Sequence, residues 1–273
     1  MSESSQRTDP SLSRALALAR DALAHEPAGL LTDFDGTLSM IVQEPSGARL
    51  VDGAGRALAA LADRLAVVAI ITGRAPLDAR RLTGIPRLLI AGNHGMEWLE
   101  PGAEEAHAGP EASSVAERLD EVLARLPELA GVIPEHKGVS ASVHYRKATD
   151  PDAARAAILS ALGDVEEHGL RIAHGRMIVE VRPVGLGDKG SAVHAIVERF
   201  DLRGVVVLGD DFTDLDMFRA VAGLRDAGRI RGAIIGVGGA DHEETPEIVA
   251  AADTMLGDPV AAADFLMRLA APA

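Results

Sequence analysis

Early in the chain the sequence reads Leu30-Leu31-Thr32-Asp33-Phe34-Asp35-Gly36-Thr37-Leu38, an apolar run that ends in two carboxylates at alternate positions. Residues 28–32 are predicted to form a buried parallel strand, because they are mostly apolar and follow a proline. Ligands of open α/β sheets bind beyond the carboxyl ends of such strands, so Asp33 is expected at a binding edge. Asp35 then falls in the following loop. Asp-Gly alone is also a common turn dipeptide, so the rest of the chain must decide between a turn and a site.

Composition excludes several classes of protein. The chain has 273 residues, 47% hydrophobic and 25% charged, as expected for a globular protein of one large or two smaller domains. It has no cysteine, which excludes disulfides and thiolate metal sites, so any metal must have oxygen or imidazole ligands. A net charge of −14 argues against a nucleic-acid partner. No apolar run of about 18 residues and no signal-peptide core are present, so neither a membrane partner nor export is indicated, and a cytoplasmic location is expected.

Strand and helix signals alternate through most of the chain, which predicts βαβ units and a parallel sheet flanked by helices. The predicted strands lie at 28–32, 66–71, 87–91, 204–208 and 232–237. The predicted helices lie at 12–24, 53–64, 76–82, 188–200, 213–221 and 259–270.

A different pattern interrupts these units. Two antiparallel hairpins are predicted at 132–137 with 139–146 and at 170–173 with 177–181, accompanied by helices at 113–126 and 151–162. We therefore expect an inserted smaller α/β cap domain, an antiparallel sheet with two helices. The expected division is an N-terminal helical extension at 1–26, a core at 27–107 and 187–273, and the cap at 108–186.

Four polar segments follow strands or begin helices in this pattern. They are Asp33-Phe34-Asp35-Gly36-Thr37, Thr72-Gly73-Arg74, Lys189 and Gly209-Asp210-Asp211-Phe212-Thr213-Asp214. Each one alone has an ordinary interpretation as a turn, a solvated lysine or a helix cap. Together, and in this order, they resemble the four motifs of the haloacid dehalogenase (HAD) superfamily of aspartate-nucleophile phosphotransferases. The resemblance implies a HAD-like Rossmannoid core.

The resemblance also implies catalytic roles. Asp33 would be the nucleophile that forms an aspartyl-phosphate, and Asp35 would protonate the leaving oxygen and then take a proton from water. Lys189 would balance the clustered acids and hold a phosphate oxygen, while Thr72 would donate a hydrogen bond to another.

Mg²⁺ is the expected cofactor, because hard carboxylate oxygens without imidazole or thiolate suit this ion. The resemblance implies three ligands, namely the Asp33 side chain, the Asp35 backbone carbonyl and Asp210. Asp211 and Asp214 would reach the ion through bound waters.

Further segments resemble the trehalose-6-phosphate phosphatase family within this superfamily. They are Gly92-Asn93-His94-Gly95-Met96-Glu97, Glu135-His136-Lys137-Gly138-Val139-Ser140, Glu180-Val181-Arg182-Pro183 and residues 209–218. The resemblance covers about residues 30–218 and departs slightly at Gly187-Asp188-Lys189-Gly190, where the family usually has Gly-Lys-Gly. It implies hydrolysis of trehalose 6-phosphate to trehalose and phosphate, the last step of trehalose biosynthesis, and a functional coupling to a trehalose-6-phosphate synthase.

In that family the cap closes over the active site and binds the sugar hydroxyls. The matching positions here are Glu135, Lys137 and Glu180, and a polyol is well recognised by such acceptors and donors. The remaining substrate-binding candidates are Gly73, Arg74, Asn93, His94 and Arg182.

Several alternatives stay open. Glu135 and Lys137 alternate along a strand and also fit a solvated face, and Arg182 also fits a structural ion pair. The substrate could instead be sucrose phosphate, glucosylglycerol phosphate or mannosylglycerate phosphate, or the enzyme a phosphohexomutase. A non-catalytic phosphate-binding regulator is disfavoured, because it would need neither Asp35 nor a sugar-binding cap.

Overall fold

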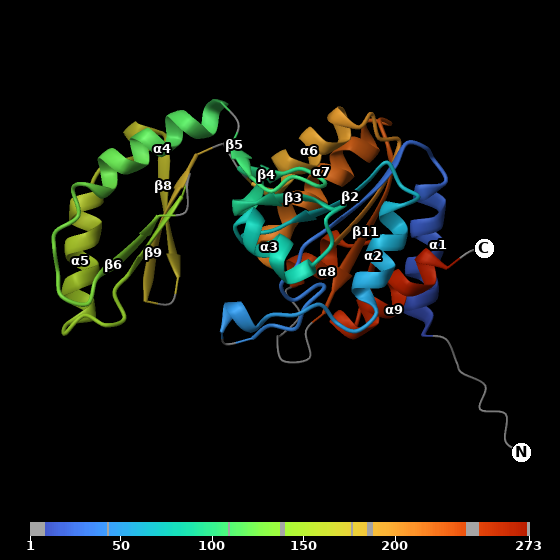
Figure 1. The fold of residues 1–273 in the computed structure, drawn as a ribbon, viewed down its shortest axis with the longest axis horizontal. Helices are drawn as coiled ribbons and strands as arrows, with labels where there is room; N and C mark the ends of the chain where they lie inside the picture. The colour runs from blue at the N-terminus through green and yellow to red at the C-terminus, as the bar shows by residue number, and fades with distance from the viewer. Residues whose placement is uncertain are drawn as a thin grey trace, which may run out of the picture. The chain divides into compact units, whose positions relative to one another are not determined.

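The computed structural model describes residues 9–271 except for 43, 109, 137–139, 176, 185–187 and 239–245. The chain divides into two units, one of Met1–Ala106 with Asp188–Ala273 and the other of His107–Gly187. Each unit is built around its own β-sheet (Figure 1).

The sheet of the first unit has β1 near its middle. In spatial order its strands are β12 (Thr254–Leu256), β11 (Arg231–Val237), β10 (Gly204–Gly209), β1 (Ala28–Thr32), β2 (Val67–Ile71), β3 (Leu89–Gly92) and β4 (Glu97–Leu99). The strands from β12 to β3 pair in parallel, and β4 is antiparallel to β3. Every residue of β1, β2 and β10 is buried, as expected for parallel strands covered on both faces.

The position of β1 creates a binding edge. From β1 the chain continues to β2 and β3 on one side of the sheet, and it later returns to β10, β11 and β12 on the other side. The register places Thr32 beside both Leu208 and Ile70, so the carboxyl ends of β10, β1 and β2 lie together. Ligands of open α/β sheets bind at such a switch of strand order.

Helices cover both faces of this sheet (Figure 1). They are α1 (Pro10–Leu23), α2 (Ala54–Ala62), α3 (Pro76–Thr83), α6 (Lys189–Arg199), α7 (Leu215–Asp226), α8 (Pro246–Ala251) and α9 (Pro259–Ala270), with short 3₁₀ turns at Pro45–Gly47, Asn93–Gly95 (η2) and Phe212–Asp214 (η4). One apolar cluster joins α1, α2 and α9 to the sheet, and a second joins α6 and α7 to the opposite face.

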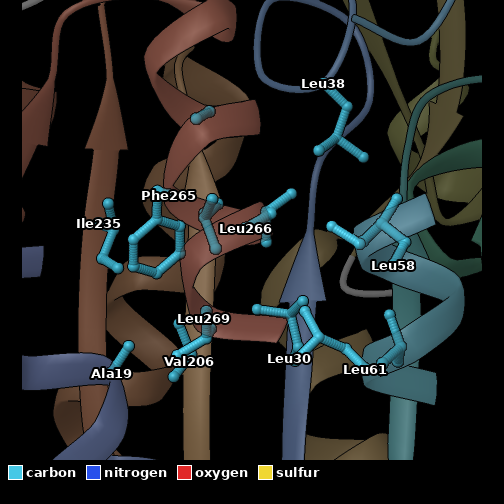
Figure 2. Packing of buried hydrophobic residues seen from close by; sticks show 14 of the residues in the cluster. Ala19, Leu30, Leu38, Leu58, Leu61, Val206, Ile235, Phe265, Leu266 and Leu269 are labelled. Carbon is cyan, nitrogen blue, oxygen red and sulfur yellow. The ribbon is translucent and has the colours of Figure 1, made fainter. Parts of the chain in front are cut away.

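Figure 2 shows part of the first cluster, where Phe265, Leu266 and Leu269 of α9 lie among residues of the sheet and of α1 and α2. The N-terminal helix α1, expected as an extension outside the catalytic core, contributes to this cluster. Its buried residues repeat at helical spacing, so one face of the helix is apolar. They are Leu12, Ala15, Leu16, Ala19 and Ala22.

The second unit has a four-stranded antiparallel sheet in the order β6 (Ile133–His136), β7 (Ala141–His144), β9 (Ile178–Pro183), β8 (Leu170–Gly175). Its helices are α4 (Pro110–Leu123), α5 (Pro151–Leu162) and the 3₁₀ turn η3 (Val165–His168), and a short strand β5 (His107–Ala108) begins the unit. Burial alternates along β9, so one face of this sheet is covered, and Figure 1 shows α4 and α5 beside it.

The predicted fold class is confirmed, since a largely parallel sheet flanked by helices accompanies an antiparallel sheet with two helices. The prediction missed β4, β5, α8 and β12, each of six residues or fewer, which carry too little periodicity to be recognised. None of the helices in the described part of the chain combines the length and apolar character needed to cross a bilayer.

Candidate active site

Polar side chains meet at the carboxyl edge of the first sheet, directly after three adjacent strands. Asp33 follows β1, Thr72 follows β2 and Asp210 follows β10. Because β1 pairs with both other strands, these residues leave the sheet side by side. Lys189 joins them from the first turn of α6, which is capped by the Asp188 side chain through the backbone N–H of Ser191.

Lys189 connects two buried carboxylates. Its Nζ donates to Asp33 Oδ1 over 2.7 Å and to Asp214 Oδ1 over 2.6 Å. All three side chains are buried, with exposures of 3%, 6% and 0%. A charge in such a place is stable only when it is paired and hydrogen-bonded, so the lysine and the two aspartates depend on one another.

The pKa values of these groups reflect this dependence. Burial raises the pKa of Asp33 well above its ordinary value; Lys189 opposes the shift, while the charges of Asp214 and Asp210 add to it. Burial also raises the pKa of Asp214. For Lys189, burial acts to lower the pKa, but attraction to Asp33 and Asp214 outweighs it and raises the pKa above its usual value. The lysine therefore stays charged across the physiological range.

Asp210 completes the acidic cluster. Its Oδ1 accepts a 2.6 Å hydrogen bond from the Thr37 hydroxyl, and its backbone N–H donates to Asp214 Oδ2 over 2.8 Å. Burial raises the pKa of Asp210 to about 7; the Thr37 hydrogen bond opposes this shift, and the nearby carboxylates of Asp214 and Asp211 add to it.

The cluster fits a divalent cation. Asp33, Asp210 and Asp214 each offer a carboxylate oxygen, and these oxygens lie within 4.8 Å of one another. Burial is the main cause of the raised pKa values of Asp33 and Asp210, the neighbouring carboxylates add to it, and a cation bound here would favour the charged forms. Oxygen donors of this kind suit Mg²⁺. Both Asp214 oxygens already accept hydrogen bonds from the protein, which suits a contact with the ion through water.

The side chain of Asp35 is engaged separately by Arg74. Nε of Arg74 donates to Asp35 Oδ2 over 2.6 Å and Nη2 donates to Asp35 Oδ1 over 2.7 Å. Nη1 donates to Asp78 Oδ2 over 3.0 Å, and the guanidinium carbon lies 5.5 Å from the centroid of the Phe34 ring. The hydrogen bond to Asp35 raises the pKa of Arg74 above its ordinary value. The guanidinium predicted to contact substrate is thus held by two carboxylates of the protein.

The turn η2 holds the backbone that follows β2. The backbone N–H groups of Asn93 and His94 donate to the carbonyls of Arg74 and Thr72, both over 2.8 Å. Asn93 and His94 have φ of +48° and +59°, a conformation that is uncommon outside glycine but that Asn and His adopt more often than most residues. The His94 ring lies so close to Gly73 that a Cβ there would be 2.9 Å from His94 Cε1. Gly73, Asn93 and His94, which the sequence predicts to bind substrate, therefore lie around Thr72. The side-chain amide of Asn93 donates from Nδ2 to Glu97.

The predicted sugar-binding residues of the second unit share one sheet face. Glu135 on β6 is directly opposite Ser142 on β7, which is opposite Glu180 on β9, so all three project from the same side. His144 Nε2 lies 2.9 Å from Glu135 Oε2. Arg182 Nη2 donates to Glu180 Oε2 over 2.6 Å, an ion pair of the kind that the sequence left open. Lys137 lies outside the described residues.

The sequence did not identify Asp78 or His144 as parts of these constellations. Asp78 lies four residues after Arg74 at the start of α3, a spacing that brings side chains together on a helix and could have signalled the pair. The contact of His144 with Glu135 depends on strand register, which a single sequence does not specify at this hairpin.

A sequence model described as trehalose-phosphatase matches residues 31–234. The chain belongs to this family. The resemblance recognised in the motifs is therefore confirmed, and it extends over more than half of the chain.

Individual relatives agree with the family. A trehalose-phosphate phosphatase of Mycobacterium avium (strain 104) is 38% identical over 270 residues, which cover 96% of this chain and 66% of that protein. The chain thus spans just under two thirds of the length of this relative.

Solved structures agree on the fold. Aspergillus fumigatus trehalose-6-phosphate phosphatase superposes with a TM-score of 0.65 at 26% identity, covering 95% of this chain and 97% of that one. The C-terminal domain of the Candida albicans trehalose-6-phosphate phosphatase superposes with a TM-score of 0.69 at 24% identity, covering 94% of this chain and 96% of that one. The predicted HAD-like fold class is consistent with both.

Gly36 gives a first test of the site geometry. Its φ is +82°, and a Cβ at this position would overlap the Asp210 carboxylate. We expect Gly36→Ala to displace Asp210 and to lower phosphatase kcat by roughly 100-fold, as misplaced catalytic groups do. The control is Gly102→Ala, since Gly102 has φ +76° but open space around it. This variant should lose about 1 kcal/mol of stability and no activity. Equal losses of activity in the two variants would contradict the predicted overlap.

Asp210 gives a second test, through the pH dependence of stability. Between its ordinary pKa of 3.8 and the raised value of about 7, the folded protein binds more protons than the unfolded chain, so stability falls as pH rises. Asp210→Asn cannot ionise. In a chelator we expect this variant to be more stable than wild type at pH 8 by roughly 2–4 kcal/mol, with the advantage shrinking as pH falls and disappearing below about pH 4.

The measurement is denaturant unfolding at several pH values. Asp63→Asn serves as control, because Asp63 is exposed and paired with Arg87. A difference between wild type and Asp210→Asn that does not change with pH would contradict the raised pKa.

Proposed function

We propose that the protein hydrolyses trehalose 6-phosphate to trehalose and inorganic phosphate through an aspartyl-phosphate on Asp33. The observation that carries the proposal is the buried pairing of Asp33 with Lys189 beside Asp210, in a member of the trehalose-phosphatase family. The choice of substrate is supported by the similarity to a trehalose-phosphate phosphatase and to a trehalose-6-phosphate phosphatase of known structure.

In the first step an Asp33 oxygen attacks phosphorus and the bond from phosphorus to the sugar oxygen breaks. Asp35 gives its proton to the leaving sugar oxygen. In the second step Asp35 takes a proton from water, the water oxygen attacks phosphorus, and the bond to Asp33 breaks to release phosphate. Lys189 lies 2.7 Å from Asp33 Oδ1, so its ammonium is placed to neutralise charge on the transferring group. Thr72 would donate a hydrogen bond to another phosphate oxygen.

Mg²⁺ fits the donor set at this site. The side chains of Asp33 and Asp210 and the backbone carbonyl of Asp35 would hold it, with Asp211 and Asp214 acting through water. When bound, the ion supplies positive charge that offsets the carboxylates and the phosphate. The Thr37 hydrogen bond fixes the orientation of the Asp210 carboxylate for this role.

Sugar recognition is assigned to the second unit. Glu135 and Glu180 lie on one sheet face with Ser142 between them, so their carboxylates can accept hydrogen bonds from several hydroxyls. A site built in this way discriminates between sugars, because a ligand that lacks one of these hydroxyls displaces water from an acceptor and leaves it unpaired. Lys137, Arg182, Gly73, Asn93 and His94 remain predicted substrate contacts. The cytoplasmic location, the coupling to a synthase and the division of residues 1–26, 27–107, 108–186 and 187–273 also remain predictions.

A panel of phosphate esters tests the proposed substrate. Wild-type protein with Mg²⁺ should release phosphate from trehalose 6-phosphate faster than from the other sugar phosphates, and a chelator should abolish the release. Asp33→Asn should reduce turnover to background because the amide is not a nucleophile, whereas Asp63→Asn should not change it. If sucrose phosphate or another ester were hydrolysed faster than trehalose 6-phosphate, the proposed substrate would be wrong. Full activity of Asp33→Asn would refute the covalent mechanism.

Glu180 tests the role of the second unit. Glu180→Ala should lower kcat/KM for trehalose 6-phosphate by roughly 10- to 1,000-fold through lost transition-state binding, while p-nitrophenyl phosphate, which has no sugar, should be hydrolysed as before. The matched control is Glu167→Ala, at an exposed glutamate of η3. Equal losses on both substrates would mean that Glu180 supports the fold or the catalytic centre rather than the sugar.

A further inference from the structure

Arg74 uses every nitrogen of its guanidinium within the protein. Nε and Nη2 form two parallel hydrogen bonds to the two oxygens of Asp35, and Nη1 donates to Asp78. The guanidinium carbon lies over the Phe34 ring, 5.5 Å from its centroid. These bonds use three of the five N–H groups, and the side chain is only 11% exposed, so the position of the guanidinium is determined by Asp35 and Asp78.

The two partners differ in how firmly they are held. The Arg74 side chain is 11% exposed, whereas the Asp35 side chain is 40% exposed in the loop after β1. The backbone of Arg74 is fixed as well, because its N–H donates to Thr72 Oγ1 over 3.2 Å and its carbonyl accepts the N–H of Asn93. Arg74 is therefore the rigid member of the pair, and Asp35 is the member that it orients.

The two parallel hydrogen bonds from Arg74 to Asp35, called the fork from here on, determine what Arg74 can do for Asp35. Two parallel bonds fix both the position of the carboxylate and its rotation, which a single ammonium cannot do. Proton transfer to a leaving oxygen requires the carboxyl group to be placed within hydrogen-bond reach of that oxygen. Proton transfer by Asp35 to the leaving oxygen would therefore depend on how its carboxyl group is oriented.

We propose that Arg74 is a positioning residue that acts on the reaction through Asp35 and not through contact with the sugar or the phosphate. Asp78 extends the arrangement, because it fixes the third nitrogen of the guanidinium. The proposal rests on the proposed function only in that Asp35 is the acid and base of a phosphate-ester hydrolysis. The identity of the sugar does not enter it.

The role predicts a dependence on the leaving group. A sugar oxygen is a poor leaving group and needs a proton from Asp35, whereas p-nitrophenolate leaves with little help. Loss of the fork should therefore slow the first step for the sugar phosphate and leave the first step for p-nitrophenyl phosphate nearly unchanged. A residue that binds the phosphate would slow both substrates alike.

The test is a double-mutant cycle of Arg74→Lys with Asp35→Asn, followed in single turnovers with the protein in excess so that only the first step is measured. Arg74→Lys should slow sugar release about 10- to 100-fold with KM and inhibition by inorganic phosphate unchanged. In the Asp35→Asn background the same change should have no further effect, because Arg74 acts through the residue already removed. Asp78→Asn should give a smaller loss with the same preference for leaving group.

The matched control is Arg199→Lys. Arg199 also forms two hydrogen bonds to one carboxylate, that of Glu100, and lies over the Phe200 ring, but at the far end of α6 from Lys189. This variant should keep full activity. The proposal would be overturned if Arg74→Lys weakened inhibition by phosphate or slowed the sugar phosphate and p-nitrophenyl phosphate equally. It would also be overturned if the losses of Arg74→Lys and Asp35→Asn multiplied in the double variant.

The outcome for Arg74 is separable from that for the substrate. If wild type prefers a different sugar phosphate in the panel, the proposed substrate is wrong, and the same cycle performed with the preferred ester still decides the role of Arg74. Arg74→Met provides a second variant that removes the charge as well as the fork. Arg74→Met should slow sugar release more than Arg74→Lys does. In the Asp35→Asn background it, too, should cause no further loss of rate.

Discussion

The ammonium of Lys189 lies between two carboxylates, Asp33 and Asp214, at the buried carboxyl edge of a parallel sheet. This interaction allows several aspartates to be concentrated at one place in an otherwise apolar fold. Without the lysine, two of them would be unpaired charges in the interior, a cost of several kcal/mol. Burial is the main cause of the raised pKa values of Asp33 and Asp210, and neighbouring carboxylates add to it even with the lysine present. A divalent cation bound beside these aspartates would favour their charged forms, and Lys189 is the proposed partner of a phosphate oxygen.

The sheet supplies the geometry for this arrangement. Because β1 lies between β10 and β2, the residues that follow these strands are neighbours although they are distant in sequence. Helix α6 then delivers Lys189 from its first turn. The loop after β1 carries Asp35 outward, where two hydrogen bonds from Arg74 hold it, so the proposed nucleophile Asp33 and the proposed acid Asp35 are held by two different interactions. Asp33 is held by its buried ion pair with Lys189, and Asp35 is held by its partly exposed ion pair with Arg74.

The sequence predicted the elements that have strong apolar patterns, because burial on both faces leaves a clear signature in β1, β2 and β10. It also predicted that Asp33, Lys189 and Asp210 would converge, since motif order combined with strand ends places them at one edge. It did not predict the partner of Arg74, because the choice between a substrate and Asp35 depends on side-chain geometry. Likewise, the amphipathic pattern of α1 predicted a helix but not its burial against α9, since a pattern does not name the surface it covers.

The central claim is that Lys189 is the counter-charge on which the acidic cluster depends. The most direct measurement is the free energy of unfolding, in a chelator, of Lys189→Met, Asp214→Asn and the double variant. We expect Lys189→Met to lose about 3–5 kcal/mol, because it leaves buried carboxylates unpaired. The double variant should be markedly more stable than the sum of the single changes predicts, since one of the unpaired charges is then absent. Strictly additive effects, or a Lys189→Met variant as stable as wild type, would contradict the account.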